Sequence, residues 1–110
     1  MLSVIVKGQY EGLHSWKGAP SEADFLRYSH RHLFYWVVGI EVIGRNREIE
    51  FFDLRRFVAN KISLKISPIA AGSCEEQAIM ILNCVKKRYP GKKIFVEIWE
   101  DNENGARAEE

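Results

Sequence analysis

The sequence lacks a strong net charge and a long apolar run. Its 110 residues carry 16 lysines and arginines against 15 aspartates and glutamates, so no overall charge draws the chain to nucleic acid or to a membrane surface. No apolar run approaches the ~18 residues of a membrane-spanning helix. The first residues show no basic segment and no small-residue cleavage site, so we expect a strand there rather than a signal peptide.

Cysteine is also scarce. Cys74 and Cys84 lie ten residues apart, within one predicted helix. A helix rises about 1.5 Å per residue, which separates their Cα atoms by roughly 15 Å and excludes a disulfide between them. The cytoplasm is therefore the expected compartment. Internal repeats and linkers are absent too, so residues 1–110 are predicted to form a single domain, with the 46% apolar and 28% charged composition of a soluble globular protein.

Alternating side chains predict two strands in the first half of the chain. Residues 3–14 place His14 on the face that carries most of the apolar residues of that strand. Residues 29–43 predict a long second strand, in which the even positions carry His30 and His32 first and apolar side chains afterwards. The two strands are expected to be members of one antiparallel sheet.

Turn-forming residues predict how these strands are connected. Residues 15–29 are expected to form a loop with a short helical turn at "SEADFLRY", in which Ser21 is the N-cap. The "GRNR" segment at 44–47 is a predicted turn. The "EIEFF" segment at 48–52 then predicts a third strand.

Helical periodicity predicts two helices in the second half. The first is capped by Asp53, and the second begins at Ser73 in a capping box with Glu76. "YPG" at 89–91 ends the second helix. The predicted buried positions are Leu54, Phe57, Val58 and Ile62 in the first helix and Ala78, Ile81, Leu82, Val85 and Tyr89 in the second.

The last part of the chain predicts a return to the sheet. "KKIFVEIWE" at 92–100 alternates as a strand, and "DNENGARAEE" at 101–110 is either a turn with a short strand or a frayed tail. Strands grouped apart from helices predict an α+β fold, with the helices on one face of an antiparallel sheet.

All three histidines of the chain are expected to lie together. His30 and His32 point to the same side of one strand, about 7 Å apart. His14 ends the first strand, and antiparallel pairing sets that end beside the start of the next strand. Three imidazole nitrogens without a fourth protein ligand are typical of the open zinc site of catalytic proteins. For each histidine the alternative is a surface or core residue with a satisfied hydrogen bond.

The order of these features resembles that of the 6-pyruvoyltetrahydropterin synthase family. The family includes the bacterial 6-carboxytetrahydropterin synthases of the queuosine pathway and has the tunnelling fold, or T-fold. Its pattern is a strand ending in histidine, an H-x-H strand, a D-F-x-x-L step, a P-T-x-E-N helix start, and V-x-V-x-E followed by an alanine. The similar segments are "GLH" ending at His14, "HRH" at 30–32, "EFFDL" at 50–54, "GSCEEQA" at 72–78, "VEIWED" at 96–101, and Ala106.

The resemblance implies a site and an assembly. His14, His30 and His32 would bind zinc, and Glu100 would anchor the amino-pyrimidine edge of a pterin by accepting two N–H bonds. Ser73 would help to hold the ring. Family members form trimers, often stacked into hexamers, in which the strands join into a barrel and the sites lie between subunits. Such an assembly would cover the exposed edges of a small sheet.

The proton-transfer residues of the family are missing from this chain. The family cysteine four residues before H-x-H is replaced by Leu26, and an Asp–His pair between the helices has no counterpart. In the D-F-x-x-L step, Glu50 stands in place of the aspartate. Cys74 is a candidate substitute because the first turn of a helix can lower a thiol pKa. Asp24 and Asp101 are candidate bases. A buried apolar thiol and solvated loop carboxylates are the alternatives.

Residues 86–93, "KKRYPGKK", form a basic cluster at the end of the second predicted helix. Phosphate binding is one interpretation. Positive charge at a helix C-terminus is an ordinary stabilising arrangement, and we favour that interpretation. Neither a nucleic-acid partner nor a membrane partner is expected.

Together the residues and the resemblance predict an α+β T-fold, with two helices packed on one face of an antiparallel sheet that oligomerises into a barrel as a homotrimer or homohexamer. The predicted function is that of a zinc-dependent tetrahydropterin synthase-like protein that binds a pterin- or purine-like ring, with divergent or lost lyase chemistry. A non-catalytic T-fold binder of a pterin, purine or nucleotide is the second hypothesis. A structural oligomer with vestigial histidines is the third.

Overall fold

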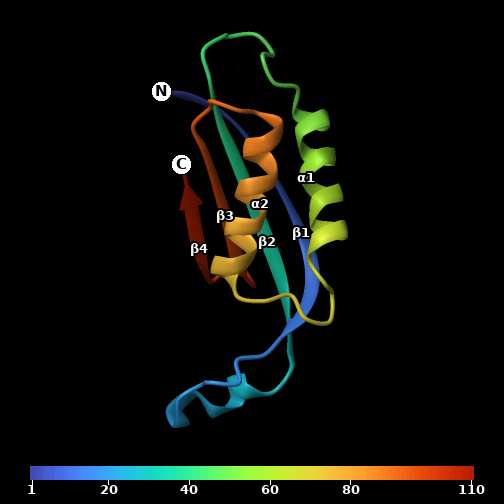
Figure 1. Cartoon of the computed structure of the whole chain (residues 1–110), viewed down its shortest axis with the longest axis vertical. Coiled ribbons are helices and arrows are strands. Elements are labelled where there is room, and N and C mark those ends of the chain that lie inside the picture. Colours follow the sequence, from blue (N-terminus) through green and yellow to red (C-terminus); the bar gives the residue numbers. More distant parts are fainter.

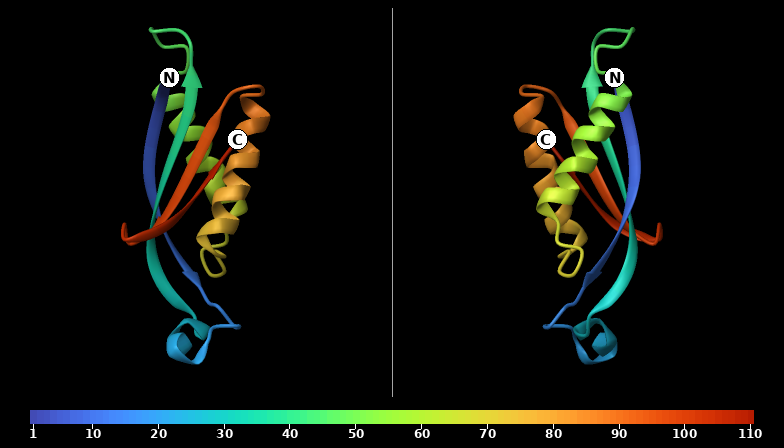
Figure 2. Two further views of the ribbon diagram at one scale, coloured as in Figure 1. Left: turned by 90° about the vertical axis from the view of Figure 1, so that its left-hand side faces the viewer. Right: turned by 90° about the vertical axis from the view of Figure 1, so that its right-hand side faces the viewer.

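The computed structural model describes residues 1–110 as an α+β fold built on one antiparallel sheet. The strands are β1 (Leu2–His14), β2 (His30–Val42), β3 (Ile94–Glu100) and β4 (Asn104–Glu109), in the spatial order β1-β2-β3-β4. Helices α1 (Phe51–Lys65) and α2 (Cys74–Arg88) cover one face of this sheet (Figures 1 and 2). A 3-10 helix, η1 (Ser21–Arg27), lies in the connection at the tip of the long β1–β2 hairpin. The predicted α+β class and the helices on one face are confirmed.

The core lies between the sheet and the two helices. Its β2 contribution consists of the even positions Phe34, Trp36, Val38, Ile40 and Val42. The helical stripes are buried as predicted, except that Phe57 and Tyr89 are only partly buried and pack against the edge of the core. Neither helix has the length and the apolar character needed to cross a membrane.

The register between β1 and β2 sets up the site. The two strands pair antiparallel, as predicted, with His14 opposite His30 and Gly12 opposite His32. Gly12 has no side chain where a Cβ atom would lie 3.1 Å from both the Phe34 ring and the Ala71 side chain. This close packing brings the chain between α1 and α2 against the end of β1.

The predicted third strand at 48–52 is wrong. These residues form irregular chain up to Glu50, and α1 begins at Phe51. The Glu48 carboxylate accepts the N–H groups of Ile43 and Gly44 at 3.2 and 2.8 Å, which holds the turn closed after β2. Both sides of β2 are already paired with β1 and β3, so this segment has no position beside β2.

Of the two predicted caps of the long helices, one is wrong and one is confirmed. The N-cap of α1 is Glu50 rather than Asp53, because the Glu50 carboxylate accepts the Asp53 N–H at 2.6 Å. The Asp53 side chain instead pairs with Arg88 of α2 at 2.9 Å. The capping box of Ser73 and Glu76 at the start of α2 is present as predicted.

The smaller segments settle three further expectations. The helical turn in the first loop is η1, and its N-cap is Pro20 rather than Ser21, with no side-chain cap, because Ser21 already lies inside the helix. The end of the chain is strand β4, paired with β3, and not a frayed tail. Cys74 and Cys84 both lie in α2 as free thiols.

Candidate metal centre

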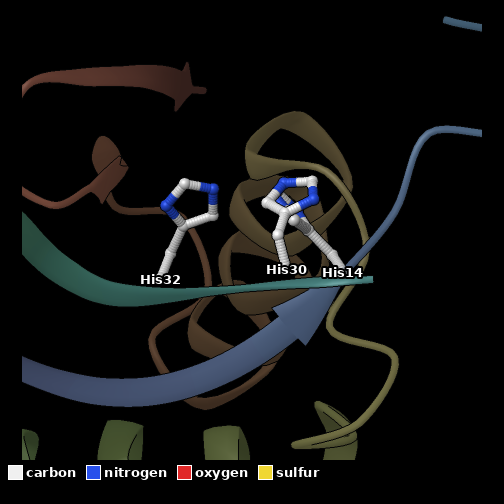
Figure 3. Close-up of side chains that lie close together, drawn as sticks. All are labelled: His14, His30 and His32. Carbon is white, nitrogen blue, oxygen red and sulfur yellow. The ribbon is translucent and has the colours of Figure 1, made fainter. Parts of the chain in front are cut away.

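The three histidines converge at the end of the β1–β2 hairpin that lies beside the start of α2. One nitrogen of each ring lies within 4.8 Å of the others, in an arrangement that can hold a metal ion. The ring centroids are 4.6 to 4.9 Å apart, so they form a nearly equilateral triangle. Figure 3 shows the side chains of His14, His30 and His32 rising from the same side of the two strands. The predicted meeting of the three histidines is confirmed.

Each histidine has its Nδ1 atom fixed by an oxygen atom. His14 Nδ1 lies 2.8 Å from the Gly72 carbonyl, and His30 Nδ1 lies 2.8 Å from the Tyr28 carbonyl. His32 Nδ1 lies 2.6 Å from the Asp101 carboxylate. A carbonyl or a carboxylate can only accept, so all three Nδ1 atoms carry the proton and donate it.

The Nε2 atoms are the side of the three rings that could hold a metal ion. With the proton on Nδ1, a neutral imidazole keeps a free lone pair on Nε2. His30 Nε2 and His32 Nε2 are buried and have no hydrogen-bond partner. A histidine that ligates a metal almost always donates its other N–H to a carbonyl, a carboxylate or water. The cluster shows this arrangement for all three residues.

Asp101 reaches His32 through the tight turn between β3 and β4. Asp101 and Asn102 have φ values of 50° and 60°, a left-handed conformation that aspartate and asparagine adopt more readily than most residues. The Asp101 carboxylate also accepts the Leu33 N–H at 2.9 Å. Hydrogen bonds from His32 and from Leu33 hold the pKa of Asp101 below its ordinary value, so the group stays ionised and orients the imidazole.

A buried polar chain supports His14. The Gly72 carbonyl accepts from both His14 Nδ1 and Gln77 Nε2, the latter at 3.0 Å. Gln77 is completely buried, and its Oε1 accepts from the Tyr10 hydroxyl. Burial raises the pKa of Tyr10, with a further contribution from Cys74, so the hydroxyl remains a donor. Gly72 has a φ of +85°, which glycine adopts without a Cβ penalty.

A cavity of about 510 Å³ opens beside the histidines. Small-molecule sites in proteins have volumes of roughly 300–1,000 Å³. The side chains that line it include His14, His30, Glu100, Ser73, Trp16 and Leu26. The predicted ring-binding residues Glu100 and Ser73 therefore share one cavity with two of the histidines.

Cys74 lies in this cavity but is a poor proton-transfer group. The residue is buried, and burial together with the charges of Glu100 and Glu75 raises the pKa of its thiol to about 12. Burial and the two carboxylates act in the direction opposite to the lowering that the sequence predicts for a thiol at a helix start. The thiol is neutral near pH 7.

The remaining charged candidates lie outside the cavity. Asp24 is exposed on η1 and pairs with Arg27 at 3.1 Å. The basic cluster at 86–93 lies at the opposite end of α2, and three of its charges are paired, with Glu110, Asp53 and Glu48. Neither feature contributes to the metal centre.

Sequence reasoning missed two contributors to the site. Asp101, a candidate base in the sequence, is the hydrogen-bond acceptor that orients His32. Gln77 is absent from the sequence-based expectations, but its position on the buried face of α2 between Cys74 and Ile81 is a signal for it. A polar residue in an apolar stripe indicates a buried hydrogen-bond network.

Asp101→Ala is predicted to weaken metal binding. Loss of a carboxylate that orients a ligating histidine typically costs about 10–100-fold in metal affinity. Competition with a chromophoric chelator measures the effect, and Asp24→Ala is the matched control because it removes an exposed loop carboxylate away from the cluster. Equal affinity in the wild type and Asp101→Ala would contradict the orienting role.

Gln77→Leu is predicted to lower both stability and metal affinity. It leaves the Tyr10 hydroxyl buried without a partner, at a cost of about 1–3 kcal/mol. The double variant Tyr10→Phe with Gln77→Leu should recover much of that stability, because both polar partners are then apolar, while its metal affinity stays about tenfold lower. Urea unfolding of the metal-free protein and chelator competition measure the two effects. Wild-type metal affinity in the double variant would show that the chain does not position His14.

No protein-family model matches this sequence. No curated protein matches it either. The resemblance to the tetrahydropterin synthases is carried by the ordered motifs of the sequence alone.

Proposed function

We propose that this chain is a zinc-dependent tetrahydropterin synthase-like protein that binds a pterin- or purine-like ring next to its three histidines. The observation that supports the proposal is the arrangement of the six imidazole nitrogens. Three Nδ1 atoms are committed to oxygen acceptors, one nitrogen of each ring lies within 4.8 Å of the others, and the Nε2 atoms of His30 and His32 are buried without a partner. Imidazole donors suit zinc, and a bound zinc ion would supply a Lewis acid that polarises oxygen atoms on the ring ligand.

The cavity provides the groups that ring recognition requires. The Glu100 carboxylate can accept two N–H bonds from the amino-pyrimidine edge of a pterin or a guanine. Ser73 lines the cavity at the start of α2, where its hydroxyl caps the helix, and the indole of Trp16, which is about half exposed, offers a flat apolar surface. A flat ring with a donor edge suits this combination.

The proton-transfer chemistry of the resembled family is not supported by these side chains. Leu26, at the position of the family cysteine, lines the cavity and carries no titratable group. Cys74 is held neutral, and Asp101 is engaged by His32. Divergent or lost lyase chemistry is therefore part of the proposal, and these three residues favour the non-catalytic binder as the second candidate function.

The T-fold assembly is proposed on the same resemblance. Strands β1 and β4 form the two edges of the sheet, and each lacks a strand partner on one side. Leu2 and Ile5 on β1 are about half exposed. A barrel formed with further copies of this chain would pair these edges and cover these side chains.

Glu100→Gln is predicted to weaken ring binding to the zinc-saturated protein. A hydrogen bond to a charged group contributes about 1.5–3 kcal/mol, which corresponds to about 10–150-fold in affinity. Calorimetric titration with pterin and with guanine measures the change. Glu97→Gln on the opposite face of β3 is the control, because its carboxylate pairs with Arg107.

The outcomes of this titration separate the candidate functions. Binding of a ring that is then converted supports the enzyme, and binding without conversion supports the binder. Equal ring affinity in the wild type and Glu100→Gln, or no binding of either ring, contradicts the proposed pocket.

Sedimentation velocity tests the assembly. We expect a species with three or six times the chain mass of 12.7 kDa, because a trimer or a stacked hexamer closes the edges of the sheet. A monomer at micromolar concentration, with and without zinc, would contradict the proposed barrel.

A further inference from the structure

We propose that Glu100 is the fourth protein ligand of the metal when no ring is bound, so that the resting site is closed. This inference rests on the metal centre of the proposed function. It departs from the open three-histidine site that the sequence predicts. It also gives Glu100 a second role besides anchoring a ring.

The Glu100 carboxylate lies beside two of the three histidines. Glu100 Oε1 lies 3.3 Å from His14 Nε2, and Glu100 Oε2 lies 3.6 Å from His32 Nε2. Ligand atoms bound tetrahedrally to zinc at about 2.0–2.1 Å are about 3.3 Å from one another. The distance to His14 equals that between neighbouring ligands, whereas the group within reach of one ion in this structure is the three histidines alone, so the inference includes a movement of the Glu100 side chain toward His30 on metal binding.

The charges around these atoms favour a cation among them. A carboxylate that faces two nitrogen lone pairs is repelled by both unless positive charge lies between them. A proton on His14 Nε2 would satisfy one such pair and would leave His30 Nε2 and His32 Nε2 buried without partners. A divalent cation satisfies all three nitrogens and the carboxylate at once.

The end of β3 delivers this ligand together with its support. Glu100 is paired with Phe34, two residues beyond His32 on β2, so its side chain lies on the face of the sheet that carries the histidines. The next residue, Asp101, holds His32 Nδ1 at 2.6 Å. Two consecutive carboxylates thus lie beside the two nitrogens of the His32 ring. Asp101 lies at Nδ1, outside the proposed metal site, and Glu100 lies at Nε2, inside it.

The double role of Glu100 would couple ring recognition to the metal. A ring whose N–H edge captures the carboxylate withdraws it from the metal and opens one coordination position. Only a ligand with a suitable donor edge would then expose the Lewis acid. The closed site would also limit binding of other small molecules to the metal.

Cobalt(II) is the probe for this inference, used on the ring-free protein. Visible absorption reports the coordination of bound cobalt, and azide binds to cobalt only where a coordination position is open. We expect the wild-type spectrum to be insensitive to azide and the Glu100→Gln spectrum to change on azide addition. The zinc dissociation constant, measured by chelator competition, should rise by about 100-fold in Glu100→Gln. This is the upper end of the effect of losing a partner that only orients a ligand.

Glu75→Gln is the matched control, because it removes a carboxylate from the same cavity that does not face the histidine nitrogens. An azide response in the wild type equal to that of Glu100→Gln, or equal zinc affinities in these two proteins, would overturn the inference and leave the three-histidine site intact. The azide titration of the wild type needs no variant to fold. Absence of cobalt binding to the wild type would overturn the metal centre itself.

Discussion

The site depends first on the antiparallel register that pairs His14 with His30. Because alternate residues of a strand share a face, this one register places His32 beside the same two rings. A shift by one residue would turn the histidines of one strand to the opposite face of the sheet. The large apolar residues that follow on β2 are buried under the helices, from Phe34 to Val42. Burial of the core and the meeting of the three histidines therefore depend on the same register.

The outer support of the histidines comes largely from backbone atoms. Two of the three Nδ1 atoms donate to carbonyl groups, those of Gly72 and Tyr28. The carbonyl of Gly72 lies within reach because the chain between the helices is hydrogen-bonded to the end of β1. The Leu13 N–H donates to the Pro68 carbonyl, and the Ala71 N–H donates to the Leu13 carbonyl. The fold thus orients the imidazoles without a metal. This would lower the conformational entropy that the histidine side chains lose when a metal binds. A site prepared in this way is consistent with a binding role whether or not the chain turns its ligand over.

The sequence predicts the parts of this fold that are determined locally. Period-two and helical patterns assign the faces of β1, β2, α1 and α2, and Ser73 with Glu76 marks the start of α2. The strand prediction for 48–52 is wrong because the same alternation also fits the start of a helix. The contacts of Glu48 with Ile43 and Gly44 determine which structure forms. Strand alternation predicts that the three histidines meet, but it does not predict the partners of their Nδ1 atoms, since His14 bonds to Gly72 and His32 to Asp101. Only the folded chain brings these groups together.

Zinc content is the most direct measurement of the central claim that the three histidines form a metal centre. Elemental analysis of tag-free protein, with His32→Ala beside it, gives zinc per chain, and circular dichroism reports whether the variant keeps the fold. The account predicts about one zinc per chain in the wild type and none in a folded His32→Ala. No zinc in the wild type after zinc has been supplied, or the same zinc content in both proteins, would contradict it.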